Sequence, residues 1–366
     1  MSGDKEKGIN RESQRIECSR TFLGEMPMEE CYFAGGNSGE GFFDCFDQII
    51  PKGEKKEHVI ILKGGPGVGK STLMKRVARA AMKKKEKTEL FWCSGDPDSL
   101  DAVRIVGRGI LILDGTAPHC KDPVYPGAVE EILNLGEQID REKILLRRSE
   151  IVQLSQENKE YYRRAYALLR CAAGLEEEVM REVFDCLDKK RVNKLWETIC
   201  GGTEEKDGEG GEEARTLFLD AITWKGRVSF AEEMVQGRRS VGMKGEAAGA
   251  LLDYMVRQSD ARGFWCLNPL LPERVSHIIF ENRNLFVTSA AVETDQSEES
   301  EEYFCRKPSA ELFRYQKEKE RLVSMAVKCL KQCKKLHDEL EGCYRECVDF
   351  IKITERSDEL LRKLGL

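Results

Sequence analysis

Residues 58–72 read His58-Val-Ile-Ile-Leu-Lys-Gly-Gly-Pro-Gly-Val-Gly-Lys-Ser-Thr72. The opening apolar run has the length and composition of a short buried strand. Residues 64–71 satisfy the pattern G-x-x-x-x-G-K-[ST], and residues 70–85 continue with apolar side chains at four-residue spacing, as in a helix. A strand, a glycine-rich turn and a helix in this order predict a phosphate-binding loop (P-loop) in an α/β domain.

Each residue type in this loop has a physical reason to be there. Glycines adopt the positive φ angles that turn successive backbone N–H groups inward, and the helix start adds partial positive charge. The predicted nucleotide-binding residues are Gly64, Gly65, Pro66, Gly67, Val68, Gly69, Lys70, Ser71 and Thr72. Lys70 supplies a cation for the phosphates, Ser71 offers its hydroxyl to Mg²⁺, and Thr72 is a further phosphate contact.

A second apolar run, residues 109–114, ends in Asp114. A strand would deliver this carboxylate to the sheet edge beside the phosphates, as a Walker B residue is delivered, so we expect Asp114 to hold Mg²⁺. Thr116 and His119 follow, and with Lys70 and Asp114 they form the expected catalytic set, although a loop role for His119 remains an alternative. No glutamate follows Asp114, so the catalytic base stays unassigned.

Three further carboxylates, Asp96, Asp98 and Asp101, follow the apolar run 90–93. They are candidates to bind metal or an acceptor hydroxyl, and turn or helix-cap chemistry is the alternative. The guanine-specific string Asn-Lys-x-Asp is absent, since the nearest match is Asn193-Lys-Leu-Trp. ATP is therefore the expected nucleotide.

An internal repeat divides the chain. The matching features are Phe33 and Phe218, Gly41 and Gly226, Lys63 and Lys244, Gly64 and Gly245, and Phe91-Trp-Cys93 and Phe264-Trp-Cys266. The strand 109–114 corresponds to 284–288, which places Thr288 where Asp114 stands. The second copy lacks eight residues around its loop and has no Lys-Ser/Thr pair. We therefore expect a pseudo-dimer of two halves within one chain, with a degenerate second site.

The predicted fold class is α/β: a P-loop NTPase-type parallel sheet with helices on both faces, duplicated, with a helical insert and a C-terminal helix. Residues 125–135 are expected to form a further helix that begins at Pro126. The expected divisions are a nucleotide-binding domain at 1–140, a helical insert at 141–200, an acidic flexible linker at 201–214, a degenerate P-loop-like domain at 215–292, an acidic linker at 293–308 and a C-terminal helical segment at 309–366.

Charge and composition restrict the expected ligands, partners and cellular compartment of the protein. The net charge of −6 arises in two stretches, 201–214 and 293–302, so the rest of the 366-residue chain does not repel an anionic ligand. No apolar export segment is evident, and the 14 cysteines are expected to be reduced thiols in the cytoplasm. The basic runs 52–56 and 83–87 lack interleaved aromatic residues, which makes nucleic acid an unlikely partner.

The segment 310–350 is expected to form one long helix, or a hairpin broken near Gly342. Its apolar stripe consists of Leu322, Cys329, Cys333, Leu336, Leu340, Cys343 and Cys347. Burial in a helix interface explains these cysteines, while a zinc site that also uses His337 would require the helix to fold back.

The stretches 63–75, Asp96-Pro-Asp-Ser-Leu-Asp101 and 113–129 resemble an uncharacterised bacterial family of tandem P-loop ATPase-like proteins, in the superfamily of P-loop containing nucleoside triphosphate hydrolases. The resemblance covers essentially the whole chain, including the C-terminal helix around Leu336-His-Asp-Glu-Leu340. It implies the fold and ATP binding but no substrate. Family members often have a usable P-loop in both halves, and this chain departs from that pattern in its second half.

The expected protein is thus a Mg-ATP-binding P-loop ATPase that hydrolyses ATP slowly at one site in its N-terminal half and couples this to its helical segments. A phosphotransferase (kinase) for a small acceptor and a nucleotide-gated binding module without turnover stay open. The second half is expected to be a structural partner, or the source of an arginine finger such as Arg238 or Arg239. No membrane is expected, and an unknown protein partner stays possible.

Overall fold

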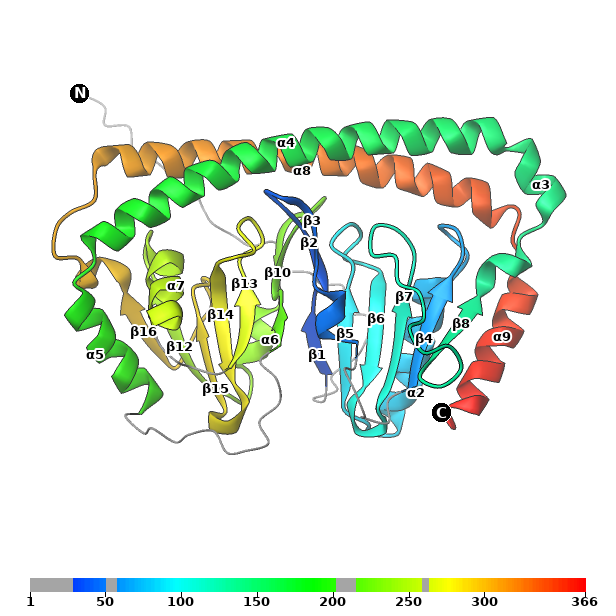
Figure 1. Ribbon diagram of the computed structural model, residues 1–366, viewed down its shortest axis with the longest axis horizontal. Helices are drawn as coiled ribbons and strands as arrows, with labels where there is room; N and C mark the ends of the chain where they lie inside the picture. The colour runs from blue at the N-terminus through cyan, green and yellow to red at the C-terminus, as the bar shows by residue number, and fades with distance from the viewer. Residues whose placement is uncertain (1–28, 51–57, 202–214, 259–262) are drawn as a thin grey trace, which may run out of the picture.

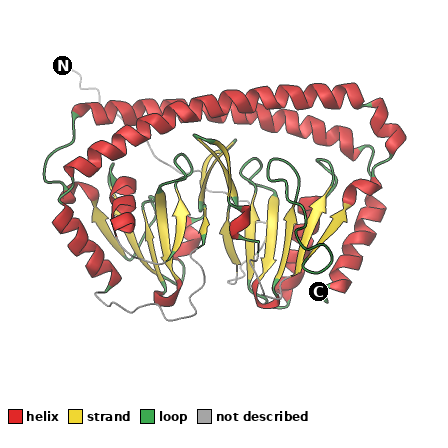
Figure 2. Ribbon diagram, in the orientation of Figure 1, coloured by secondary structure: helices red, strands yellow, loops and turns green. Residues whose placement is uncertain are grey.

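The computed structural model describes residues 29–50, 58–201, 215–258 and 263–366. The basic run 52–56 and the expected linker from residue 202 onward lie outside these residues. The described part forms two six-stranded mixed sheets, with a pair of long helices running above both of them (Figures 1 and 2).

The first sheet has the strand order β1-β5-β6-β7-β4-β8. Its strands are β1 (Glu29–Tyr32), β4 (His58–Lys63), β5 (Thr88–Trp92), β6 (Leu100–Ile105), β7 (Ile110–Asp114) and β8 (Glu130–Asn134). β4 pairs in parallel with β7 and β8, and β1 pairs in parallel with β5. β6 is antiparallel to both of its neighbours, so the expected all-parallel sheet is wrong at this strand. Helix α2 (Lys70–Lys83) packs against β5, β6 and β7.

The helix expected over 125–135 is also wrong, because this segment forms β8 and the short 3₁₀ helix η3 (Leu135–Gln138). Glu130 turns its carboxylate back to accept a hydrogen bond from the backbone N–H of Tyr125 at 2.8 Å, which closes a turn before the strand. β8 then completes the ladder on β4. Pairing with a buried strand therefore outweighs the local helical preference of this segment.

The second sheet repeats the first strand for strand, in the order β16-β12-β15-β14-β13-β9. Its strands are β9 (Thr216–Leu217), β12 (Arg239–Lys244), β13 (Phe264–Leu267), β14 (Val275–Phe280), β15 (Leu285–Thr288) and β16 (Gln296–Glu299). Helix α7 (Ala248–Gln258) packs on β12 and β14. The stretch 293–308, expected as a linker, contains β16 and the 3₁₀ helix η5 (Ser300–Tyr303). Its acidic side chains lie on an edge strand, where charge opposes further strand pairing.

The strand register corrects the predicted repeat at two places. Phe91 pairs with Ala102, and Cys266 pairs with the equivalent residue His277, so the matching tripeptides are offset by two residues. The second copy is therefore six residues shorter around its loop, where eight were expected.

Asp114 pairs with the second-last residue of β4, whereas Thr288 pairs with the third-last residue of β12. Ser289, which follows Thr288, therefore occupies the position of Asp114. The second half still has no carboxylate at this point.

The repeat extends to the helices. The first half continues with α3 (Arg141–Leu146), α4 (Arg148–Cys186) and α5 (Lys189–Cys200), and the second with α8 (Ala310–Arg345) and α9 (Phe350–Lys363). α4 and α8 lie side by side above the sheets, and Figure 1 shows each running from its own half to the other. α5 then packs on α7, and α9 packs on α2. The expected helical insert and C-terminal helix are thus equivalent parts of the two copies.

The two halves meet through their small hairpins, β2 (Gly35–Ser38) with β3 (Gly41–Asp44), and β10 (Asp220–Thr223) with β11 (Gly226–Ser229). Just before these hairpins, Phe33 and Phe218 exchange backbone hydrogen bonds of 2.9 and 3.1 Å. Because these residues are equivalent in the repeat, the pseudo-two-fold axis passes between them. The helix α6 (Ala231–Val235) contacts both β1 and β15, and the buried core continues from one half into the other.

Helix α8 is continuous through Gly342, and the hairpin alternative is not observed. Cys333, Cys343 and Cys347 are buried, and the Cys333 thiol lies against the backbone of α4 at Asn158. In the part of the chain that the structure describes, no three potential ligand side chains gather in a metal-binding cluster. None of the described helices is both long enough and apolar enough to cross a membrane.

Candidate functional site

The glycine-rich turn joins β4 to α2, as the sequence predicts. Gly64, Gly67 and Gly69 have φ angles of +141°, +73° and +97°. L-residues rarely adopt these conformations, so the turn depends on glycine at these positions. Gly69 is the N-cap of α2, and the helix therefore presents its free N–H groups toward the turn.

Lys70 begins α2, and its ammonium group folds back over the turn. Its Nζ donates hydrogen bonds to the carbonyl oxygens of Gly64 at 2.8 Å and Gly65 at 3.0 Å. The residue is buried, and its Nζ lies 3.6 Å from Oδ2 of Asp114. Since β7 is the parallel neighbour of β4, the sheet itself brings this carboxylate beside the turn. Lys70 and Asp114, both expected in the site, therefore lie side by side.

Thr116 orients Asp114. Its backbone N–H and its hydroxyl both donate to Oδ1 of Asp114, at 2.9 and 2.6 Å. This leaves Oδ2 facing Lys70. Ser71 accepts a hydrogen bond from the N–H of Leu100 at 3.0 Å, which ties α2 to β6 and leaves the hydroxyl proton uncommitted. A hydroxyl and a carboxylate are both oxygen donors of the kind that Mg²⁺ prefers.

His119 lies beneath Asp114 and does not line the turn. Its Nδ1 is 2.8 Å from the backbone oxygen of Asp114, and its Nε2 is 3.5 Å from Oδ2 of Asp101. The ring is buried and stacks on Phe46 with centroids 4.3 Å apart. Burial alone lowers the pKa of His119, but the carboxylate of Asp101, followed by Asp114, outweighs it and raises the pKa to about 9. His119 is therefore a charged support for Asp114.

This charge makes stability depend on pH. The folded-state pKa of His119 lies above its unfolded value of roughly 6.5. The contribution of the charged ring to the free energy of unfolding is therefore fully present below pH 6.5. The contribution is then lost as the pH rises through about 9. We expect His119→Asn to lower the free energy of unfolding by about 3 kcal/mol more at pH 6.5 than at pH 9.5. Urea unfolding of both proteins at the two pH values measures this, and an equal cost at both would contradict it.

The three other aspartates are not brought together as one site. Asp98 accepts two hydrogen bonds from Lys225 of the second half, each 2.7 Å long. Asp96 accepts a hydrogen bond from Ser99 at 2.8 Å and lies 3.5 Å from Lys334 of α8. With Asp101 beside His119, each has a separate partner. The expected acceptor or metal group is therefore not supported, and turn chemistry describes Asp96 better.

The side chains of the two candidate arginine fingers bind other groups of the chain. Arg238 pairs with Glu30 at 2.7 Å and with Glu281 at 3.6 Å. Arg239 donates to the backbone oxygen of Ile199. Arg238 therefore reaches from the second half to β1 of the first sheet, Arg239 holds α5, and the finger hypothesis is not supported.

Sequence reasoning missed the residues that cover the turn. A Cβ placed on Gly65 would stand 2.5 Å from the ring of Tyr344, and one on Gly67 would stand 2.9 Å from the backbone oxygen of Glu341 and 3.2 Å from Cγ of Arg345. The last turn of α8 therefore lies directly on the glycines. The contact spans more than 270 positions of sequence and leaves no local pattern, except that glycine is the residue that permits so close an approach.

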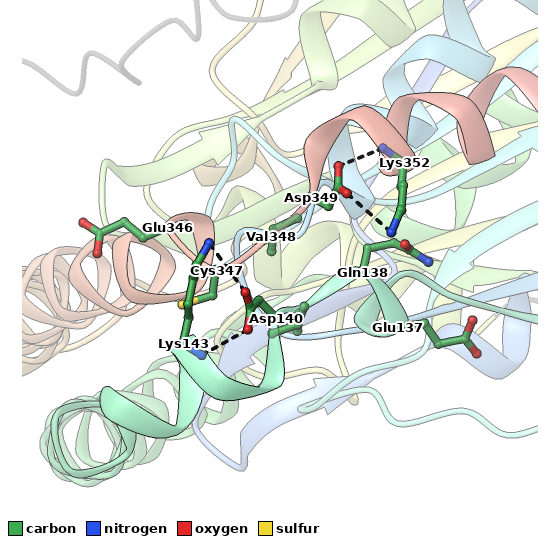
Figure 3. Close-up of a pocket in the computed structure, with 10 residues that line it drawn as sticks. Glu137, Gln138, Asp140, Lys143, Glu346, Cys347, Val348, Asp349 and Lys352 are labelled. Carbon is green, nitrogen blue, oxygen red and sulfur yellow. Dashed lines mark hydrogen bonds and ion pairs between the residues drawn. The ribbon is translucent and has the colours of Figure 1, made fainter.

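The junction of α8 with α9 is fixed to the first half beside this cover. Asp140 N–H donates to the oxygen of Cys347 at 2.7 Å, and Asp349 N–H donates to the oxygen of Gln138 at 2.9 Å. A pocket opens here between the N-caps of α3 and α9 (Figure 3). Figure 3 shows two ion pairs among the lining residues, Asp140 with Lys143 and Asp349 with Lys352. The pocket therefore marks the point where the end of α8 is attached to the first half.

Comparisons with known proteins identify no relative. No protein-family model matches the chain, and neither a curated protein nor a solved structure is significantly similar to it. The resemblance noted from the motifs therefore gains no support from these comparisons. The structure itself establishes an α/β fold with two mixed sheets, and most strand pairs of each sheet are parallel.

Proposed function

We propose that the first half binds a magnesium nucleoside triphosphate, ATP, at residues 64–72, and that the protein is a slow ATPase of the tandem P-loop type. The observation that carries this proposal is the position of Lys70. Its ammonium group bonds the carbonyl oxygens of a glycine turn and lies 3.6 Å from a carboxylate on the neighbouring parallel strand. A cation, free N–H groups and a metal-binding carboxylate around one turn suit a polyphosphate.

The roles follow from these contacts. The backbone N–H groups of the turn and Lys70 would bind the phosphates, with Thr72 as a further contact. Ser71 and Asp114 would hold Mg²⁺, which neutralises phosphate charge when it is bound. Thr116 orients Asp114 and His119 supports it from below. No residue in this set is free to act as a general base, which is the reason to expect slow hydrolysis.

We further propose that occupancy of the turn is coupled to α8. The last turn of this helix lies on Gly65 and Gly67, and near its other end Gln316 donates to the backbone oxygen of Glu246 in the second half at 3.0 Å. A 36-residue helix is about 54 Å long, so α8 connects the turns of both halves. A ligand that displaces one end of such a helix shifts contacts at the other.

Calorimetric titration of the full chain with Mg-ATP, with phosphate release recorded on the same sample, tests the proposal. Binding together with slow release supports an ATPase. Binding without release favours one of the two alternatives, and ADP formed only after a hydroxyl-bearing acceptor is added then separates a kinase from a nucleotide-gated module. Absence of binding would overturn the assignment of the turn.

The cover over the turn gives a second prediction. Tyr344→Ala removes the ring that lies on Gly65, so less packing has to be displaced by an incoming nucleotide. Because an aromatic contact contributes about 1 kcal/mol or more, we expect Mg-ATP to bind about five- to tenfold more tightly. Phe313→Ala truncates an exposed aromatic residue at the far end of the same helix and is the matched control. Weaker binding by Tyr344→Ala would show that the ring holds the nucleotide instead of excluding it.

A further inference from the structure

The turn of the second half is shorter than the first, but it also begins with a glycine of positive φ and leads into a helix. Gly245 follows β12 with a φ of +91°, as Gly64 follows β4. α7 begins three residues later, so its first N–H groups face the same side as those of α2. The side chain of Lys244, at the end of β12, is exposed and has no hydrogen-bond or ion-pair partner among the described residues.

A carboxylate of the chain itself occupies this turn. Oε1 of Glu301, in η5, accepts a hydrogen bond from the N–H of Glu246 at 2.9 Å. A Cβ on Gly245 would collide with both carboxylate oxygens of Glu301. An anion thus lies against the turn of the second half, and it is supplied by the chain.

The first half has no such group. β8 and β16 pair with the last residues of β4 and β12 in the same register, and counting onward from them makes Gly136 the equivalent of Glu301. The N–H of Gly136 lies 3.1 Å from the place where a Cβ on Gly64 would stand. At this position a glycine brings no side chain to the first turn, whereas a glutamate fills the second.

A second, independent observation comes from Ser300. This residue is 0% exposed, and its Oγ has no hydrogen-bond partner. The oxygen lies 2.6 Å from the position of a Cβ on Gly245, so it points into the turn. Its counterpart in the first half is the apolar Leu135. A buried hydroxyl without a partner is costly unless a ligand completes its hydrogen bonds.

We infer that residues 244–248 with Ser300 form an anion site for a single phosphate group, and that Glu301 closes this site as an internal substitute for the ligand. The site lacks a counterpart of Lys70, so it offers too little positive charge for a triphosphate. A phosphate can accept from Glu246 N–H and from the Ser300 hydroxyl, and Lys244 is the residue that precedes the turn. The inference does not depend on nucleotide binding by the first half.

Thermal unfolding of the full chain in inorganic phosphate tests the inference. All variants in this experiment also carry Lys70→Ala, because this substitution weakens any response of the first turn to phosphate. The protein with Lys70→Ala alone is the background protein. Glu301→Gly, added to it, recreates the glycine of the first half. We expect a saturable rise in melting temperature of about 2–4 °C at phosphate concentrations ten to a hundred times the dissociation constant, compared with chloride of equal ionic strength. The background protein and the control Glu302→Gly, which removes an exposed neighbouring carboxylate, should show no such rise.

A folded Glu301→Gly variant that responds to phosphate only as it responds to chloride would overturn the inference, and so would an equal response of Glu302→Gly. If Glu301→Gly does not fold, Glu301→Gln replaces it. This variant keeps the side-chain length and an oxygen that can accept from Glu246 N–H, but it removes the charge. Phosphate should then raise its melting temperature above the value in chloride, which it does not do in the background protein, and the absence of that difference would also reject the site.

Discussion

Lys70→Ala is expected to reduce phosphate release from Mg-ATP by at least about 10²–10³-fold. The ammonium group is the only buried cation that the described residues place at the turn, where it lies beside both the loop carbonyls and Asp114. Removing it takes away the charge that would stabilise the phosphate oxygens during transfer. It also removes two hydrogen bonds that hold the turn, so nucleotide binding should weaken as well.

Lys83→Ala is the matched control, because Lys83 lies on the same helix, carries the same charge and is exposed. We expect its turnover and its affinity for Mg-ATP to equal those of the unmodified protein. Circular dichroism of both variants shows whether the fold is retained. Undiminished turnover by a folded Lys70→Ala protein would place the hydrolytic site elsewhere in the chain.

The second large effect concerns the contact between the halves. Arg215, from the second half, donates to both carboxylate oxygens of the buried Glu89 in β5, at 2.5 and 3.1 Å. Arg104 is a weaker partner at 3.6 Å. Arg215→Ala leaves Glu89 buried with this weaker partner alone, and we expect the free energy of unfolding to fall by about 3 kcal/mol.

Chemical denaturation measures that loss, and Arg215→Lys should recover only part of it because an ammonium group cannot make the bidentate contact. Arg321→Ala is the control, since Arg321 and its partner Glu318 form an exposed pair on α8. Such a pair contributes less than about 1 kcal/mol. Equal costs for Arg215→Ala and Arg321→Ala would mean that the contact between the halves is no stronger than a surface ion pair.

The local sequence was sufficient to predict the glycine turn and the strand that ends in Asp114, because an apolar run followed by such a turn is typical of few other structures. It was also sufficient to detect the repeat, because the tripeptides lie in equivalent strands, β5 and β13. The ladders nevertheless make Phe91 the equivalent of Cys266, so the tripeptides themselves are offset by two residues. The local sequence was insufficient for β6 and β8. These strands carry polar side chains such as Arg104 and Glu131, and their pairing depends on neighbours distant in the sequence.

The residues that cover or fill the two turns could not be predicted from the local sequence either, because they too come from segments distant in the sequence. Tyr344 reaches Gly65 only because α8 crosses the whole molecule. Glu301 lies in an acidic run whose composition suggests a linker, and only the pairing of β16 with β12 brings it to Gly245. His119 was identified as a candidate, but its burial under Asp114 comes from packing on Phe46, which no spacing rule predicts.

The crossing of α4 and α8 has a consequence for ancestry. Each half sends its long helix to the other half and finishes there with a short helix, α5 or α9, capped by an equivalent aspartate, Asp188 or Asp349. Two separate copies of one such half would exchange these helices and close as a domain-swapped two-fold homodimer. In such a homodimer, any substitution changes both turns at once. In this single polypeptide the two turns can differ, and they do, because one holds Lys70 and the other is filled by Glu301.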